Sequence, residues 1–206
     1  MIEAVSVCVD YSDHLDVTCD NINVLDRWMV VTHPSDINTI DICKSTKIEH
    51  VETNVMYDNG AHFAKGRAIN AGLRLLNCTD WLLHIDADIL LPKDFLDIIE
   101  RAELDPSCIY GARRAFNNTV RTEINPRTNQ LHARPLIGFF QLWHSSMYKD
   151  YPQQSTHAGD DDQEMSLRYE WPCKWKYLDM VVEDVSGEFC TNWYGRKMHR
   201  RISLLD

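Results

Sequence analysis

The sequence predicts an α/β fold in which helices flank a mixed, mainly parallel central sheet. Three observations lead to this prediction: short apolar runs alternate with segments of helical spacing, one helical segment is rich in small residues, and acidic side chains follow several of the runs. Ligands of such sheets bind beyond the carboxyl ends of the strands. We therefore look for chemistry where the predicted strands end.

Composition places limits on the class of protein. The 206 residues are enough for one domain with a sizeable core, and 44% hydrophobic with 25% charged residues is typical of soluble globular proteins. A formal net charge of -10 argues against nucleic acid as the main partner. Seven scattered cysteines favour reduced thiols, and we find neither a basic leader nor a run of about 20 apolar residues. We expect a cytoplasmic protein without a transmembrane segment.

The first half of the chain carries the clearest alternation of elements. We expect strands over residues 5–10, 28–32, 48–56 and 81–91, and helices over 35–44, 63–76 and 93–102. Ser35 is expected to cap the first of these helices. Small residues on one face of the helix over 63–76, such as Ala68 and Gly72, permit close packing on a sheet.

The second half is more irregular. We expect a strand over 109–114, an exposed excursion or hairpin over 117–134, a return to the core over 135–143, and a helical pattern after the acids at 160–162. No linker long enough to separate two domains is present. The expected organisation is a single domain over 1–206, with a nucleotide-binding half at about 1–105 and an acceptor-binding half at about 106–206.

Asp86 and Asp88 follow the most apolar predicted strand. Because the side-chain period of a strand is two, both carboxylates would leave the same face if the run continues extended. Such hard oxygen ligands suit Mn²⁺ or Mg²⁺, which keep coordination positions open for phosphate oxygens. The alternative is that the two acids only end the strand and cap the next helix.

Asp160, Asp161 and Asp162 form a second acidic cluster before a helical pattern. Acids at this position often cap a helix and face the positive end of its dipole. The functional alternative is that one of them is a general base that deprotonates an acceptor hydroxyl. A metal at the first acid pair would then stabilise a diphosphate leaving group.

The motifs also stand in a telling order: Asp10-Tyr11, the helix over 63–72, Asp86-Ala87-Asp88, Gly138-Phe139-Phe140 and Gly159-Asp160-Asp161-Asp162. In this order they resemble the GT-A-fold glycosyltransferases, with a pattern like that of the β-1,4-galactosyltransferase branch and its small bacterial and viral relatives. The resemblance covers most of residues 4–198 as spaced motifs. It implies a GT-A, Rossmann-like catalytic domain.

The resemblance also implies roles for the matching positions. On the donor side it implies contacts to the nucleotide sugar from Asp10, Tyr11, Lys65 and Asp86, and metal ligation by Asp86 and Asp88. On the acceptor side it implies Asp161 as the catalytic base and Asp160 as a ligand of acceptor hydroxyls. A single base without an evident nucleophile implies inversion at the anomeric carbon.

The third metal ligand departs from the family pattern. Relatives often place a His just before a segment like Asn192-Trp193-Tyr194-Gly195-Arg196, and the corresponding lead-in here contains no His. Asp184 could substitute, His199 could approach from beyond the motif, or water could fill the position.

For two further residues, Arg196 and Trp143, side-chain chemistry leaves two alternative roles open. Arg196 begins the basic run 196–201, which is either a solvated tail or a segment that folds over the diphosphate. Trp143 is one of several aromatic residues that either stack on an acceptor sugar or belong to the core.

Together these observations predict an inverting, metal-dependent glycosyltransferase that moves a sugar from a nucleotide-sugar donor, a UDP-sugar, to an acceptor hydroxyl of a glycan. One alternative is a metal-dependent nucleotidyltransferase, although the sequence after the first strand is not the glycine-rich loop which that class uses. Another is a catalytically silent sugar- or nucleotide-binding module of the same fold.

Overall fold

The computed structural model describes residues 1–117, 119–120, 124–125, 130–131, 138–159, 161 and 175–186. Its strands are β1 (Ile2–Val7), β2 (Arg27–Thr32), β3 (Glu49–Glu52), β4 (Trp81–Ile85), β5 (Ile89–Leu90), β6 (Ile109–Phe116), β7 (Thr119–Val120), β8 (Ile124–Asn125), β9 (Gln130–Leu131), β10 (Phe140–His144) and β11 (Trp175–Asp184). Its helices are α1 (Ser12–Thr18), α2 (Ile37–Thr46), α3 (Lys65–Leu73) and α4 (Phe95–Arg101), with short 3₁₀ helices η1 (Cys19–Asn23), η2 (Val55–Gly60) and η3 (Ser145–Met147).

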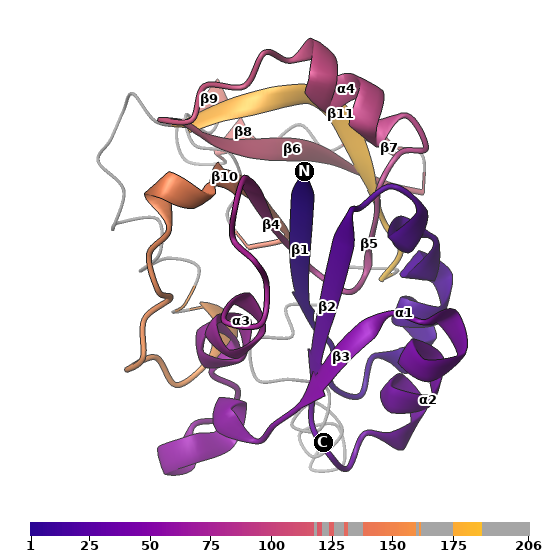
Figure 1. Cartoon of the computed structure of the whole chain (residues 1–206), viewed down its shortest axis with the longest axis vertical. Helices are drawn as coiled ribbons and strands as arrows, with labels where there is room; N and C mark the ends of the chain where they lie inside the picture. The colour runs from indigo at the N-terminus through magenta and orange to yellow at the C-terminus, as the bar shows by residue number, and fades with distance from the viewer. Residues whose placement is uncertain are drawn as a thin grey trace.

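The described strands form one nine-stranded mixed sheet and one separate pair. The order in the large sheet is β3-β2-β1-β4-β10-β6-β11-β5, with β7 added beside β6, while β8 pairs with β9 (Figure 1). The four strands from β3 to β4 are mutually parallel. Strand β10 runs antiparallel to both of its neighbours and joins this half to the rest. The predicted mixed α/β sheet with flanking helices is confirmed.

Side chains of the parallel strands alternate between two cores, one on each face of the sheet. Ala4 and Leu83 belong to the core that α1, α2 and α4 cover, whereas Val5 and Leu82 belong to the core beneath α3. Figure 1 shows α3 on the opposite side of β1 and β2 from α1 and α2. Because both faces are covered, the central strands β1, β2 and β4 are largely apolar, whereas the edge strand β3 is mostly polar.

Helix α3 packs as closely as its small residues predicted. A Cβ added at Gly72 would lie 2.5 Å from Val5 Cγ2 and 2.7 Å from Val31 Cγ2, so a larger residue cannot enter without moving the sheet. The helix is shorter than predicted, because it begins at Lys65 and ends at Leu73.

Several predicted boundaries were wrong for local reasons. The strand expected over 48–56 ends at Glu52, because the chain turns into η2. Asp36, not Ser35, caps α2 by accepting a hydrogen bond from the Thr39 N–H. The strand expected to run from Trp81 to Leu91 stops at Ile85 and resumes only as the two-residue β5. Helix α1 and strand β11 were not predicted.

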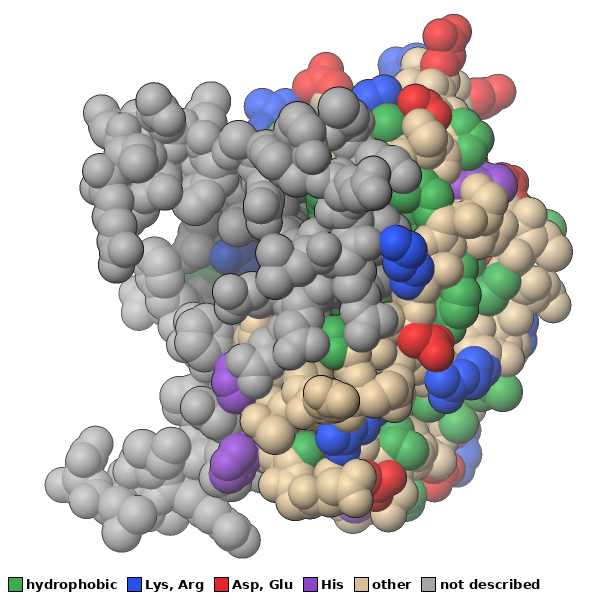
Figure 2. Space-filling model, turned by 90° about the vertical axis from the view of Figure 1, so that its left-hand side faces the viewer, with side chains coloured by type: hydrophobic (Ala, Val, Ile, Leu, Met, Phe, Trp, Pro, Cys, Tyr) green, Lys and Arg blue, Asp and Glu red, His purple; other side chains and the backbone are tan. Residues whose placement is uncertain are grey.

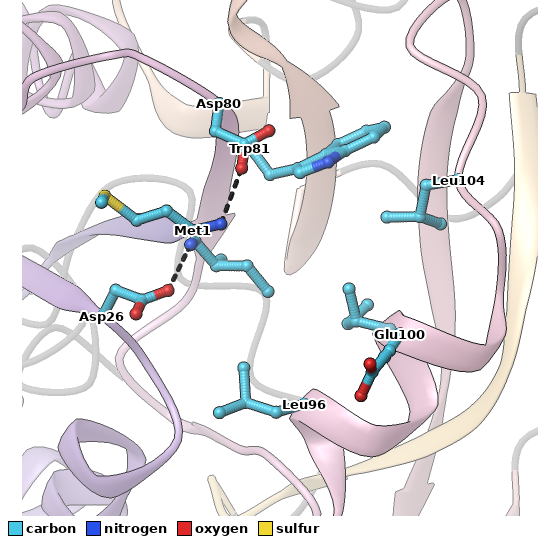
Figure 3. A pocket seen from close by; sticks show the side chains of 9 residues that line it. Met1, Asp26, Asp80, Trp81, Leu96, Glu100 and Leu104 are labelled. Atoms are coloured by element: carbon cyan, nitrogen blue, oxygen red, sulfur yellow. Dashed lines mark hydrogen bonds and ion pairs between the residues drawn. The ribbon is translucent and has the colours of Figure 1, made fainter.

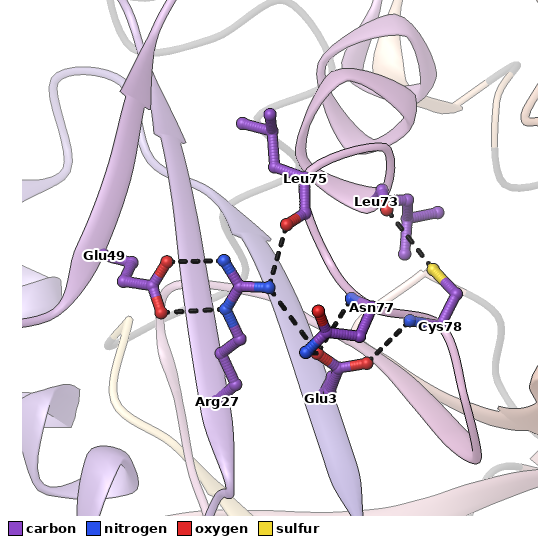
Figure 4. A network of polar contacts seen from close by, with 7 residues as sticks. All are labelled: Glu3, Arg27, Glu49, Leu73, Leu75, Asn77 and Cys78. Carbon is purple, nitrogen blue, oxygen red and sulfur yellow. Dashed lines mark hydrogen bonds and ion pairs between the residues drawn. The ribbon is translucent and has the colours of Figure 1, made fainter.

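A network of polar contacts around the buried Glu3 ties the parallel strands together near their amino ends (Figure 4). Glu3 is 1% exposed, and its oxygens accept hydrogen bonds from Asn77 N and Nδ2 at 3.0 and 3.1 Å and from Cys78 N at 2.7 Å. Arg27 lies 3.7 Å from Glu3 and donates two hydrogen bonds to Glu49. We call these five residues the Glu3 network. It fixes the loop between α3 and β4.

The surface gives no sign of a polyanion site on the face that Figure 2 shows. Over the described part of that face, basic and acidic side chains are interspersed rather than gathered by sign. Among the helices that the structure describes, none has the length and apolar character required to cross a membrane.

Candidate active site

The carboxyl ends of β2, β1 and β4 lie side by side, because these strands are parallel neighbours. Asp10 follows β1 with a left-handed backbone (φ 60°), and its N–H donates to Asp36 Oδ2 at 2.7 Å. Thr32, at the end of β2, also contacts Asp36 Oδ2, at 3.5 Å. Sequence reasoning missed Asp36. Its position just before a helix, as a preferred N-cap residue, was the available signal.

Tyr11 and Tyr57 flank the Asp10 turn. Tyr11 is the N-cap residue of α1, and its ring lies 5.2 Å from that of His14. Burial, with smaller contributions from Asp10 and Asp36, raises the pKa of Tyr57 to about 12, so its phenol is neutral at pH 7. The predicted nucleotide contacts Asp10 and Tyr11 therefore share a compact, partly aromatic corner.

Asp86 and Asp88 stand in a turn rather than on a continuous strand. The turn is closed by the Ile89 N–H, which donates to Asp86 O at 3.1 Å. The expectation that strand pleating alone would align the two carboxylates was wrong. Segments missed in the sequence hold the turn, since Thr18 donates to Ala87 O at 2.7 Å. Asn21 then fixes β5 by donating to Ile89 O at 2.8 Å.

Lys65 supplies the cation that faces Asp86. Its Nζ lies 2.5 Å from Asp86 Oδ1 and donates a second hydrogen bond to Gly138 O at 2.9 Å. Gly138 has φ 125°, a conformation that favours glycine. The Asp86 N–H donates to Phe139 O at 3.0 Å, so the predicted Gly-Phe-Phe stretch supports both partners of the ion pair. Lys65 was expected on the nucleotide, and here it binds a predicted metal ligand.

His84 is a second group behind Asp86 that sequence reasoning did not assign. Its Nε2 lies 3.5 Å from Asp86 Oδ1, and its side chain is fully buried. Burial and the nearby Lys65 lower the pKa of His84, so the imidazole is neutral at pH 7. A histidine immediately before an acid pair, at the end of a buried strand, was the available signal.

The two acids of the pair have opposite electrostatic settings. Burial would raise the pKa of Asp86, but Lys65 and His84 outweigh it and hold that pKa at about 2. Burial, together with the charges of Asp86 and Asp184, raises the pKa of Asp88 to about 7. Lys65 lowers the pKa of Asp86 strongly, whereas no described cation has a comparable effect on the pKa of Asp88.

Asp184 is brought to this place by β11. The end of β11 pairs with β5, so that Asp184 stands opposite Ile89 and the Val185 N–H donates to Asp88 O at 2.9 Å. Its carboxylate is paired with Arg114 Nη1 at 3.2 Å and accepts two hydrogen bonds from Ser186. The predicted substitute for the missing His is thus adjacent to Asp88 but already engaged.

The donor set fits a divalent cation in part. Asp86 and Asp88 offer hard carboxylate oxygens, and burial, followed by the charges of Asp86 and Asp184, makes the ionised form of Asp88 costly unless a cation binds it. Within the described residues, however, no group of three or more His, Cys, Asp or Glu side chains is assembled for a metal ion. The pair could hold a metal that takes its other ligands from substrate and water.

Asp161 occupies a structural position. It is fully buried, its Oδ2 accepts a hydrogen bond from the Gly66 N–H at 2.7 Å, and its Oδ1 contacts the Ser155 hydroxyl. The predicted capping alternative concerned the helix that follows, which lies outside the described residues, whereas here Asp161 meets the start of α3. A general base must reach its substrate, and this buried carboxylate does not fit that role as it stands. Lys65 and Gly66 connect the two acidic clusters.

The other predicted site residues fall into two groups. Trp143 is 1% exposed and packs in the core beneath α3, so the structure favours its core alternative over a sugar contact. Asp160, Arg196 and His199 lie outside the described residues, and their predicted roles stay predictions.

A cavity of about 400 Å³ lies at the opposite edge of the sheet (Figure 3). It is formed at the amino ends of β1 and β4 and along α4 by Met1, Ile2, Asp26, Asp80, Trp81, Leu96, Ile99, Glu100 and Leu104. None of the predicted site residues that the structure describes lines it.

Comparison with known proteins finds no matching family model and no matching curated sequence. Solved structures do match. Glucosyl-3-phosphoglycerate synthase from Mycobacterium tuberculosis, in complex with phosphoglyceric acid, has a TM-score of 0.62 at 12% identity, covering 92% of this chain and 72% of that one. The same enzyme with Mn²⁺, UDP and glucosyl-3-phosphoglycerate has a TM-score of 0.55 at 14% identity, covering 88% and 71%.

A second enzyme shares the likeness more distantly. Mannosyl-3-phosphoglycerate synthase from Rubrobacter xylanophilus has a TM-score of 0.53 at 19% identity, covering 72% of this chain and 54% of that one. The expected nearness to the β-1,4-galactosyltransferase branch stays a prediction. At these identities the likeness establishes architecture, and the chain has the GT-A-like fold of these sugar-transferring synthases.

Proposed function

We propose that the chain transfers a sugar from a nucleoside-diphosphate donor, a UDP-sugar, to an acceptor hydroxyl with the help of Mn²⁺ or Mg²⁺. The observation that carries the proposal is the pairing of Asp86 and Asp88 at the carboxyl edge of the parallel strands, where Asp88 is buried beside the carboxylates of Asp86 and Asp184. The fold supports it, because the similar glucosyl-3-phosphoglycerate synthase was crystallised with UDP and Mn²⁺.

On the donor side, different residues have different proposed roles. Asp86 and Asp88 would hold the metal, which when bound supplies positive charge for a diphosphate leaving group. Lys65 keeps Asp86 ionised and fixed through a 2.5 Å contact. Asp36 holds the Asp10 turn, where we place the ribose and base.

On the acceptor side we retain inversion, with a base drawn from the acids at 160–162. Asp161 would have to leave Gly66 and Ser155 to act directly, so we assign it first a positioning role at the start of α3. The acceptor of the similar synthase is phosphoglycerate. An anionic acceptor is therefore the first alternative to the expected glycan hydroxyl.

The test is a screen of UDP-sugars against sugar and phosphoglycerate acceptors with Mn²⁺, in which released UDP is measured and the product anomer is assigned by NMR. We expect metal-dependent turnover and an inverted anomeric centre. Retention of configuration would refute the mechanism, and metal-independent turnover would refute the role of the acid pair.

Asp161→Asn distinguishes the two roles of that residue. A positioning role predicts a lower melting temperature with activity reduced only partly. Loss of turnover with unchanged stability and unchanged donor binding would instead identify Asp161 as the base.

The burial of Asp161 also supports a second candidate, a sugar-nucleotide-binding module without transfer activity. That protein would bind UDP with Mn²⁺ and release no UDP from any donor in the screen.

A further inference from the structure

A buried polar chain runs behind Asp86 through three side chains on the α3 side of the sheet. His84 on β4 and Gln141 on β10 are directly opposite each other in the antiparallel pair. The Tyr151 hydroxyl lies 3.1 Å from His84 Nδ1 and also contacts the side-chain amide of Gln141. His84 Nε2 then lies 3.5 Å from Asp86 Oδ1. The chain thus ends on a proposed metal ligand.

These three residues are fixed in place. His84 and Tyr151 are fully buried and Gln141 is 2% exposed. The backbone of Tyr151 is clamped by Asn70 of α3, which accepts from Tyr151 N at 2.7 Å and donates to Tyr151 O at 3.0 Å. A polar group in such surroundings is stable only when its hydrogen bonds are made.

Which group donates in each hydrogen bond follows from the buried donors that still need an acceptor. Gln141 Nε2 and His84 Nε2 are both buried without a hydrogen-bond partner at normal distance. Exchanging the N and O of the Gln141 amide moves no heavy atom and lets Nε2 donate to the Tyr151 oxygen. The Tyr151 hydroxyl can then donate to His84 Nδ1, which leaves the imidazole proton on Nε2, facing Asp86.

We propose that Gln141, Tyr151 and His84 form a one-directional hydrogen-bond chain that positions Asp86 through an N–H donated to Oδ1. Lys65 contacts the same oxygen at 2.5 Å, so in this proposal both donors act on Oδ1 and leave Oδ2 for a divalent cation. His84 is a positioning residue. The inference rests on the proposed function for its metal, whereas the hydrogen-bond chain itself belongs to the metal-free protein.

The first test is the tautomer of His84, read by ¹⁵N NMR of the metal-free full-length protein. The chain predicts a neutral imidazole with its proton on Nε2. Removal of the donor in Tyr151→Phe is expected to shift His84 toward the Nδ1-protonated form. A wild-type His84 protonated on Nδ1 would overturn the proposal.

The second test is the affinity for Mn²⁺ alone, measured by electron paramagnetic resonance. Tyr151→Phe and His84→Phe are each expected to weaken binding by about 10-fold or more, as is usual when the partner of a metal ligand is removed. His84→Gln is expected to retain most of the affinity, because its amide N–H can replace Nε2–H.

Trp28→Phe is the matched control, because it removes a buried 2.9 Å hydrogen bond to Ser6 elsewhere in the sheet. It is expected to lower stability and leave Mn²⁺ affinity unchanged. Mn²⁺ affinity at the wild-type level in both Tyr151→Phe and His84→Phe would overturn the positioning role. If the wild-type protein binds no Mn²⁺, the proposed function and the positioning role of His84 are both overturned. The tautomer of His84 would still decide whether the hydrogen-bond chain exists.

Discussion

Two clusters of charged side chains lie at opposite edges of the same parallel strands, and they differ in how their charges are balanced. In the Glu3 network at the amino edge, both oxygens of Glu3 accept hydrogen bonds and Arg27 bridges two carboxylates. In the cluster at the carboxyl edge, Lys65 neutralises Asp86, whereas Asp88 is left among carboxylates.

The difference is the one expected between a structural cluster and the proposed metal site. Satisfied buried charges fix a loop and need nothing further. Surplus negative charge is tolerated where a ligand offsets it, and perturbed carboxyl groups of this kind gather at functional sites. Both clusters lie close to strand ends, so neither burial nor location alone would have told them apart.

Removing the surplus acid gives the largest expected effect. Asp88→Asn should weaken Mn²⁺-dependent UDP binding by about 1,000-fold, because a charged ligand of the diphosphate site is lost. Stability should be unchanged or higher, because repulsion from Asp86 and Asp184 is relieved. Calorimetric titration and thermal unfolding measure the two quantities. Retained binding would make Asp88 a structural residue like Glu3.

Removing the charge of Glu3 should have the reverse profile. Glu3→Gln is expected to lower the free energy of unfolding by about 3 kcal/mol, because it breaks a buried network of charges and donors. Urea unfolding measures the loss. UDP binding at a temperature where the variant is folded should match the wild type, and a weaker affinity would contradict the separation of the two edges.

Two glycines of α3 test the same contrast within one helix. A Cβ at Gly66 would lie 2.5 Å from Asp161 Oδ1, and a Cβ at Gly72 would lie 2.5 Å from Val5 Cγ2. Each Gly→Ala change should cost about 2 kcal/mol of stability through overpacking. Only Gly66→Ala should also reduce turnover, because Gly66 adjoins Lys65. Equal turnover in the two folded variants would show that the start of α3 has no functional role.

The pH dependence gives the smallest expected effect. The pKa of Asp88 is raised from 3.8 to about 7 by burial and its acidic neighbours. A metal requires the carboxylate, so Mn²⁺ affinity should fall by about 10-fold per pH unit below pH 7. The contribution of Asp88 to the stability of the metal-free protein has the opposite sign: it is fully present below about pH 4 and lost as pH rises through 7. Thermal unfolding of the wild type and Asp88→Asn checks this, and parallel profiles would contradict it.

Much of the parallel half could be predicted from the sequence. Its central strands are largely apolar because both faces are buried, and α3 carries small residues where it touches the sheet. Helix α1 was missed because only Leu15 and Thr18 of its seven residues are buried, which leaves little periodicity. Strand β11 did carry a period-two signal in Leu178, Met180 and Val182, which are its buried apolar positions.

The candidate acid pair could be picked out from the sequence, but the partners of its side chains could not. The spacing of Asp86 and Asp88 identified the pair, yet a turn and not a pleat positions them. Contacts across the fold, such as Lys65 with Asp86 and Asp161 with Gly66, depend on the packing of α3 and leave no local pattern. The insertion of β10 beside β4 places Gln141 opposite His84 for the same long-range reason.

The central claim is that the acid pair at the carboxyl edge is a divalent-metal site for a nucleoside diphosphate. The most direct measurement is a calorimetric titration of UDP into the wild-type protein with Mn²⁺ and again with EDTA, with Glu3→Gln as the folded control. The account predicts binding with Mn²⁺ in both proteins and none in EDTA. Absence of binding with Mn²⁺, or equal affinity in EDTA, would contradict it.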